Sequence, residues 1–312
     1  MRKDGWLKMC AFAALALALA SAAIARLAPR DVKDIALAEN DHCNLDGDLI
    51  LQLDRFAVSH YPSGKVKQYT SSVKTLDGGT GLVEPAEISV NHPLRRNGWW
   101  IYQMGRGVDE SVPSRSVNCA VIRCVRDPFL PLAAVAGVLA VAGALLLSFV
   151  PRMERETSSS RFCRMAALFA AAITAALPVV IIARAVFAPE PQPALQSILM
   201  APHVAAYTAS YLILLFAAFG IGRRAVPIGF FLMTVGLVVG ALWGKIAWSD
   251  WWQFDPKENW SFATWCAFAV HLALPPKSRW SRVALWTGAV LIVVTLTWVN
   301  FSRFTAGLHS YV

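Results

Sequence analysis

Charged residues are scarce in this sequence. Asp, Glu, Lys and Arg make up 16% of the 312 residues, against about 25% in soluble domains, and hydrophobic residues make up 56%. A wholly soluble enzyme is therefore excluded. The net charge of +9 does not indicate nucleic-acid binding, because the basic residues lie mostly in short segments between long apolar runs. We expect an integral membrane protein in contact with lipid, without a nucleic-acid partner.

Long apolar runs predict the membrane part of the chain. Seven segments have roughly the 20 residues that are needed to cross a bilayer. They are residues 7–26, 129–150, 165–187, 204–222, 226–247, 260–274 and 284–303. The first is also consistent with a cleaved signal peptide, because small residues follow its Ala-rich core. We favour an N-terminal membrane anchor over residues 1–28.

Lys and Arg in the short loops give one orientation for all of these spans. Arg2, Lys3 and Lys8 place the N-terminus in the cytoplasm. Basic residues in the loops 151–164, 223–224 and 275–283 place these loops on the same side if the spans alternate. Residues 188–203 contain no Lys or Arg and fall outside. The tryptophan-rich stretch near residue 250 and the C-terminus are then extracytoplasmic.

Residues 29–127 lack long apolar runs and alternate apolar with polar residues, which is typical of antiparallel β-structure. Segments 49–58 and 65–73 predict two strands joined by a turn at YPSGK. Segments 88–90 and 99–103 flank a second turn at Asn97–Gly98, because both residues tolerate positive φ. We expect a small all-β domain, a sandwich or an open barrel, on the outer side. A second span at 128–150 follows it, and residues 151–312 form the remaining membrane domain.

Cysteine motifs for haem attachment are also absent. No CxxCH occurs, so the chain does not itself carry covalently attached haem. Cys43, Cys119 and Cys124 fall in the outer domain, where an oxidising compartment permits a disulfide. Because Cys119 and Cys124 lack the CxxC spacing, we favour a structural bridge with one thiol left over above a redox-active pair. The pairing among the three stays open.

Residues 241–265 hold six of the twelve tryptophans. An aromatic belt at a membrane surface needs about one or two at each helix end. Six in and around one outer loop therefore indicate a binding surface for a large flat ligand, on which indole faces stack. Lys245 or Lys257 can meet the carboxylates of such a ligand. Haem fits this description, and a quinone or a lipid headgroup remains an alternative.

Two histidines fall beside this loop in the predicted topology. His203 opens the fourth span and His309 follows the seventh, both at the outer surface. Two imidazoles from different helices can bind a haem iron from opposite faces. A simple polar residue at a helix end is the alternative for either histidine alone.

Several segments resemble a known family. WGKIAWSDWWQFDPKENWSFATW resembles the tryptophan-rich WWD signature of haem-handling cytochrome c biogenesis proteins of the CcsA/ResC type. PALQSILMAPHVAAYTASY and GLHSY resemble the two outer histidine segments of that family. SVNHPLRRNGWWIYQ and LILQLDRFAVSHYPSGKVKQYTSSV resemble the C-terminal part of ResB-type proteins. Together the resemblance covers most of residues 45–312.

The resemblance implies a compact fusion of the two halves of a system II cytochrome c synthase in a bacterial inner membrane. Haem b, a transiently bound substrate, is expected to have His203 and His309 as axial ligands. Thiols of an apocytochrome c CxxCH motif then add to the haem vinyl groups, a lyase-type reaction that assigns no protein nucleophile or acid/base. A thioredoxin-like thiol reductant and a separate biogenesis subunit are further implied partners. The implied haem-binding residues are Trp243, Trp248, Trp251, Trp252, Asp255 and Trp260.

Three features depart from the family pattern. Phe254 stands where Trp is usual, and most of the ResB half is missing. His271 stands two residues before the family's intramembrane histidine position, Ala273, and two residues turn a helix by about 200°. Haem export through the membrane is therefore less well supported than haem binding outside. Arg184 is a further candidate for a haem propionate, although snorkelling to the interface is favoured.

Two other functions remain open from the sequence. A haem transporter or carrier uses the same pocket without forming thioethers. A quinone-binding membrane subunit uses the tryptophan loop for a quinone.

Overall fold

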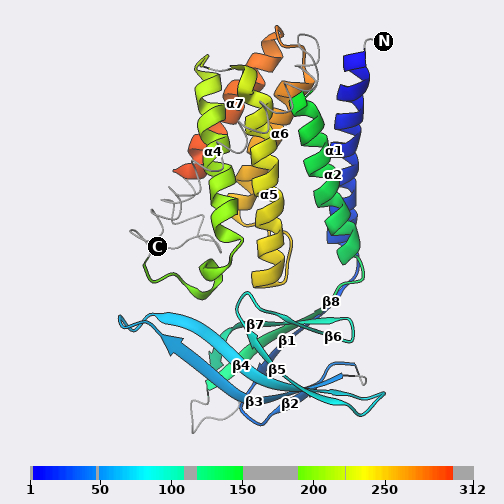
Figure 1. Cartoon of the computed structure of the whole chain (residues 1–312), viewed down its shortest axis with the longest axis vertical. Coiled ribbons are helices and arrows are strands. Elements are labelled where there is room, and N and C mark those ends of the chain that lie inside the picture. Colours follow the sequence, from blue (N-terminus) through cyan, green and yellow to red (C-terminus); the bar gives the residue numbers. More distant parts are fainter. Residues whose placement is uncertain (1–2, 47–48, 109–117, 150–188, 222, 298–312) are drawn as a thin grey trace.

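A computed structural model describes residues 3–46, 49–108, 118–149, 189–221 and 223–297. The predicted span at 165–187, Arg184 and His309 lie outside these residues. Figure 1 shows long helices with a β-structure at one end of them. This β-structure lies in the chain between α1 (Lys3–Leu27) and α2 (Leu130–Phe149), and the N-terminus is at the opposite end of the helices (Figure 1).

The β-structure is a sandwich of two four-stranded antiparallel sheets, in the orders β1-β8-β7-β6 and β2-β3-β4-β5. The predicted alternation is seen in β3, where Leu49, Leu51 and Leu53 are buried and the residues between them less so. Ile101 and Ile122 of the other sheet share their core, so the open barrel is excluded. The strands are β1 (Asp31–Leu37), β2 (His42–Asn44), β3 (Leu49–His60), β4 (Val66–Asp77), β5 (Val83–Ser89), β6 (Leu94–Arg96), β7 (Trp99–Val108) and β8 (Asn118–Arg126).

Both predicted turns are present, but one joins different strands from those expected. The backbone N–H of Tyr61 donates to the carbonyl of Lys65 at 2.8 Å between β3 and β4. Asn97 and Gly98 have φ values of 46° and 79°, as a tight hairpin turn requires. They join β7 to the short strand β6, whereas β5 belongs to the other sheet. Strand β6 was not predicted, because its three residues are too few for an alternation to be recognised.

The three cysteines of the sandwich are thiols in the structure. Cys124 is completely buried in the core, and Cys43 packs against this core from the facing sheet. Cys119 is also buried, five residues earlier on β8 and therefore on its other face. A bridge between the sheets, if one forms, is thus expected to use Cys43 and Cys124, with Cys119 as the remaining thiol.

Alkylation tests this arrangement. Burial raises the pKa of the Cys124 thiol to about 12, so it stays protonated at pH 8 and is a poor nucleophile. Cys43 is only partly buried. In reductant, we expect iodoacetamide to modify Cys43 at least about tenfold faster than Cys124, as measured by mass spectrometry of the peptides. Equal rates would contradict this placement, and protection of both residues that disappears on reduction would reveal a disulfide between them.

Five helices among the described residues have the length and hydropathy to cross a membrane. They are α1, α2, α4 (Met200–Ala218), α5 (Val226–Trp248, preceded by a short 3-10 turn) and α7 (Arg279–Leu296). Each overlaps one of the predicted spans. The predicted sixth span corresponds to α6 (Pro256–Ala273), which does not meet these criteria and has Lys257 and Glu258 in its first turn.

The six helices share a core. Its buried residues include Leu15 of α1, Leu147 of α2, Leu214 of α4, Phe230 of α5, Phe268 of α6 and Leu285 of α7. Within a membrane such helices are held by close packing and by hydrogen bonds, because lipid is as apolar as the side chains. One such bond joins the indole N–H of Trp265 to the Thr234 hydroxyl at 2.9 Å. This core fixes the ends of α4, α5 and α6 that form the candidate site.

Candidate functional site

Three glycines recur every four residues along one face of α5: Gly236, Gly240 and Gly244. A Cβ added at Gly240 would lie only 2.5 Å from Cε1 of His203, and one at Gly236 only 2.7 Å from Cδ2 of Tyr207. Two aromatic side chains of α4 therefore rest directly on the backbone of α5. Small residues at this spacing are a known signal for close helix contact, and they were the sequence feature from which this contact could have been predicted.

This close approach fixes the imidazole of His203. Its Nδ1 lies 2.8 Å from the carbonyl oxygen of Gly236. A carbonyl oxygen can only accept a hydrogen bond, so Nδ1 carries the hydrogen and Nε2 carries the ring lone pair. A backbone carbonyl that orients a histidine in this tautomer is the usual support of a metal-binding imidazole.

The ring of His203 belongs to a row of aromatic rings. Its centroid lies 5.1 Å from that of Tyr207 and 5.8 Å from that of Trp243, in edge contacts. Trp243 in turn lies 5.2 Å from Trp248. The structure thus brings together His203, Trp243 and Trp248, three of the residues that the sequence analysis predicted to share a site.

Trp243 is buried and is held by a hydrogen bond. Its side chain is 2% exposed, and its indole N–H donates to the carbonyl oxygen of Ala194 at 3.2 Å. Ala194 lies in the 3-10 turn η2 (Pro193–Gln196), which leads into α4. This bond therefore joins the segment before α4 to the C-terminal part of α5.

The loop after α5 is shaped by its backbone and by a helix cap. Ser249 and Phe254 near its two ends have φ values of 72° and 58°, in the left-handed region. Asp255 is the N-cap of α6: its carboxylate accepts from the backbone N–H of Lys257 at 2.8 Å. Glu258 accepts from the backbone N–H groups of Gln253 and Asp255, at 2.9 and 3.2 Å.

These contacts give the acidic residues of the DPKE sequence a structural role at the start of α6. Asp255 and Glu258 form a capping box, and Pro256 stands at a helix-initiating position. The spacing of an acidic cap and a Glu three residues later was readable from the sequence. Asp255 was predicted to bind the ligand; in the structure its carboxylate caps α6 and thereby positions the loop.

The remaining tryptophans of the loop region lie in different environments. Trp252 packs edge-on against Phe262, which stacks on Trp265, at centroid distances of 5.9 Å in both pairs. This row continues from the loop into the core of the helices. Trp260, by contrast, is exposed on α6. The indole nitrogen of Trp251 is buried without a hydrogen-bond partner among the described residues.

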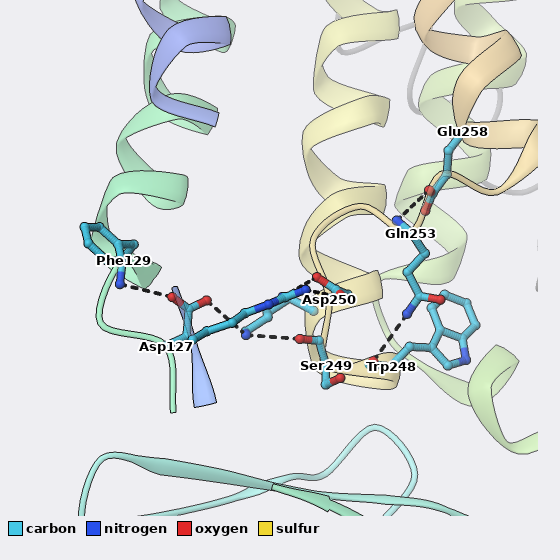
Figure 2. Close-up of polar contacts among 9 residues, drawn as sticks. Asp127, Phe129, Trp248, Ser249, Asp250, Gln253 and Glu258 are labelled. Carbon is cyan, nitrogen blue, oxygen red and sulfur yellow. Dashed lines mark hydrogen bonds and ion pairs between the residues drawn. The ribbon is translucent and has the colours of Figure 1, made fainter. Parts of the chain in front are cut away.

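Lys245, one of two lysines predicted as candidates for a ligand carboxylate, is paired within the protein instead. Its side chain is 3% exposed, and its Nζ lies 3.5 Å from a carboxylate oxygen of Asp127. It also donates to the carbonyl oxygen of Ser249 at 3.1 Å. Figure 2 labels Asp127 and Ser249, the two partners of Lys245, and Asp250 near them. Both nitrogens at the tip of Arg30 donate to Asp250. The bond to Asp250 raises the pKa of the Arg30 guanidinium, which stays charged.

His271 lies away from this site. It is near the end of α6, about 22 Å by helix rise from Pro256 at its start. Its Nδ1 lies 2.8 Å from the carbonyl oxygen of Ser281, and the Ser281 hydroxyl lies 3.0 Å from the same nitrogen. These contacts join α6 to α7, so a structural role accounts for His271.

Two family models match separate parts of the chain. Residues 219–309 match the family described as cytochrome C assembly protein, and residues 31–120 match the ResB-like family. One region of the chain is thus similar to the cytochrome C assembly family and a separate region is similar to the ResB-like family. The first region contains α5, the tryptophan loop, α6 and α7, and the second contains most of the sandwich. The helices α1, α2 and α4 of Figure 1 lie outside both matched regions.

Curated relatives resemble this chain over 90 residues. Cytochrome c biogenesis protein CcsA of Prochlorococcus marinus (strain MIT 9312) is 40% identical, and that of strain MIT 9515 is 38% identical. The match covers 28% of this chain and 29% of each relative. CcsA of Synechococcus sp. (strain WH7803) is 36% identical over the same length. The chain thus spans less than a third of the length of these relatives.

Proposed function

We propose that this protein acts in cytochrome c maturation by holding haem at the outer end of its helices. The observation that carries the proposal is the placement of His203, whose Nδ1 is bonded to the Gly236 carbonyl and whose ring lies against Trp243. In this tautomer Nε2 is the atom that binds iron. Trp243 and Trp248 supply aromatic surface beside it.

Two further residues complete the proposed haem site. His309, which lies outside the described residues, is the second axial ligand that the resemblance implies. Trp251 supplies a buried indole N–H for which the described residues offer no acceptor. Leaving such a donor unpaired costs about 1–3 kcal/mol, and a haem propionate would provide the acceptor. Trp252, Asp255 and Glu258 hold the loop that carries it.

The proposed chemistry is thioether formation on an apocytochrome c. Each thiol of a CxxCH motif adds across a haem vinyl group: sulfur bonds to one vinyl carbon and a hydrogen to the other, with no net oxidation. The protein contributes position, because a fixed haem raises the effective concentration of vinyl groups near the thiols. A thioredoxin-like reductant keeps the thiols reduced. A bacterial inner membrane is the proposed location, with the N-terminus cytoplasmic and the sandwich outside, and a separate biogenesis subunit is a further candidate partner.

The absorption spectrum of the detergent-purified protein tests the proposal. We expect a Soret band and, after dithionite, the sharp bands of a six-coordinate low-spin ferrous haem. Co-expression with an apocytochrome c, in a host that lacks its own maturation systems, should then yield covalent haem. Haem without covalent product would favour a carrier. A preparation without a Soret band would exclude the haem site and favour quinone binding.

Gly240→Ala is a structure-based test of the His203 placement. The added methyl group would lie 2.5 Å from Cε1 and 2.6 Å from Nδ1 of His203, so the ring must move, and we expect its bond to Gly236 to be lost. Because Ala favours a helix over Gly by about 1 kcal/mol, lost haem would not reflect a weaker helix. We expect the low-spin ferrous bands to fall to less than about half, since a supporting contact of a metal-binding histidine is worth roughly 10-fold or more in affinity.

Gly137→Ala is the matched control for this variant. It makes the same change in α2, where the new methyl group would meet only a methyl group of Val238, at 3.2 Å. Its spectrum should remain that of the unsubstituted protein. An unchanged spectrum in Gly240→Ala would show that His203 is not an iron ligand in the position seen here.

A further inference from the structure

The ends of the sandwich domain hold the tryptophan loop through charged groups. Arg30, between α1 and β1, donates to Asp250 through both terminal nitrogens, at 2.6 and 3.0 Å. The two side chains are only 19% and 16% exposed. A bidentate pair of this kind fixes the orientation of both partners, and screening by water is weak where both are largely buried.

A second ion pair lies beside the same loop, and its acidic partner follows the last strand of the sandwich. Asp127, between β8 and α2, is 6% exposed on its side chain and faces Lys245. Lys245 also donates to the carbonyl of Ser249, the left-handed residue that ends α5. Asp127 accepts in addition from the backbone N–H of Phe129 at 3.0 Å (Figure 2). Arg30, Asp127, Lys245 and Asp250 thus form a four-charge cluster with no net charge.

A third contact reaches the His203 side of the site. Asn91 lies in the connection between β5 and β6 with a φ of 70°. Its side-chain amide donates to the carbonyl oxygens of Pro193 and Ala194, at 2.8 and 3.2 Å. The Ala194 carbonyl also accepts from Trp243, which contacts His203. One carbonyl oxygen therefore links the sandwich to the aromatic row behind the proposed ligand.

We propose that the sandwich domain is a positioning element of the haem site. Arg30 and Asp127 set the conformation of the loop 249–255, and Asn91 sets the position of Trp243 through Ala194. None of these sandwich-side residues is expected to touch haem. This inference rests on the proposed function, and it explains why a ResB-like region and a cytochrome c assembly region occur in one chain: the first completes the site of the second.

The loop contact can be tested without haem by labelling a cysteine introduced as Ser249→Cys. Ser249 is 2% exposed, and its carbonyl accepts from Lys245 of the charged cluster. A cysteine at this position should therefore react slowly with a maleimide. Arg30→Asp sets two carboxylates against each other and should accelerate labelling at least about tenfold, which equals about 1.4 kcal/mol in the free energy of loop opening. Arg30→Asp combined with Asp250→Arg restores opposite charges and should restore slow labelling.

Lys74→Asp provides the control for the charge change. Lys74 pairs with Asp54 at 2.8 Å between β4 and β3, within one sheet of the sandwich. The labelling rate should not change in this variant. Equal rates in all variants would overturn the role of Arg30 in holding the loop.

The haem spectrum then separates positioning from simple attachment. We expect Arg30→Asp to lower the low-spin ferrous signal and the combined reversal to restore it. Faster labelling with an unchanged spectrum would overturn the positioning role, while the proposed function would stand. Absence of haem from the unsubstituted protein would instead overturn the proposed function, and the labelling rates would still report on the loop contact.

Asn91→Gly tests the positioning role of the sandwich independently, in case the Arg30→Asp protein does not accumulate in the membrane. Glycine adopts the left-handed conformation of Asn91 without strain, so the substitution removes only the side-chain contacts. We expect the low-spin signal to fall while Ser249→Cys still labels slowly, because Asn91 acts on Trp243 and not on the loop. An unchanged spectrum would overturn the role of Asn91.

Discussion

His203→Gly should remove the low-spin ferrous spectrum and reduce cytochrome c maturation by about two orders of magnitude or more, since even supporting contacts of metal-binding histidines are worth about 10–100-fold. The reason lies in the geometry of α4 and α5. The imidazole of His203 contacts the Gly236 carbonyl and the ring of Trp243. Its removal leaves one axial position of the iron open, and a five-coordinate ferrous haem is high-spin.

Added imidazole should restore part of both signals in this variant. A free imidazole can occupy the space of the missing ring, donate one N–H to the Gly236 carbonyl and present its other nitrogen to iron, as His203 does. His309→Gly should behave in the same way if it is the second ligand. Rescue by imidazole distinguishes a lost ligand from a misfolded protein, because a misfolded protein has no site for it.

His271→Ala is the matched control for both variants. Its imidazole is bonded to Ser281 near the far end of α6, so we expect some loss of stability and little change in the spectrum. If His271→Ala lost the low-spin spectrum while His203→Gly and His309→Gly kept it, the ligand would lie near the end of α6, and the proposed site would be wrong.

The pairing of β3 with β4 was predictable from alternation and a turn. Twelve-residue β3 has a clear alternation and a recognisable turn after it, and the structure has both. The three residues of β6 carry no such signal. The turn at Asn97–Gly98 was therefore found correctly, whereas the strand on its N-terminal side was assigned to the wrong segment.

A location of His203 and Trp243 at the same end of the helices was predictable from topology. Charged loops placed the start of α4 and the end of α5 on one side, and two adjacent antiparallel helices then bring these ends together. The bond from His203 to Gly236 was not predictable in this way, because it depends on the depth at which the α4 side chains sit on α5. The glycines at 236, 240 and 244 were the available signal.

The partner of Lys245 could not be predicted from the sequence, because it lies far away in the chain. The sequence around Lys245 contains aromatic residues and suggested an external carboxylate as its partner. Its partner is Asp127, which only the packing of α2 beside α5 brings within 3.5 Å. Arg30 and Asp250 are likewise 220 residues apart. Local patterns identify which residues are unusual, but tertiary packing decides which charges neutralise one another.

Trp243→Ala is expected to give the second large effect, on stability as well as on haem. Trp243 is 2% exposed and contacts His203 and Trp248. Truncation of a buried Trp costs about 3–5 kcal/mol, because the cavity left behind closes only in part. The carbonyl of Ala194 also loses one of its donors. In a chain of this size, the apparent melting temperature in detergent should fall by roughly 5–10 °C.

Two comparison variants separate the contributions of the Trp243 ring and its N–H. Trp243→Phe keeps an aromatic ring against His203 but loses the bond to Ala194 and part of the buried ring volume, so it should cost about 1–3 kcal/mol and retain most of the haem. Trp280→Ala removes an exposed tryptophan of α7, 62% exposed, and should change stability by less than about 0.5 kcal/mol. Haem content per protein should therefore rank Trp280→Ala above Trp243→Phe, and Trp243→Phe above Trp243→Ala. Full haem content in Trp243→Ala would mean that this ring supports only the fold, and that haem, if bound, contacts other tryptophans of the loop.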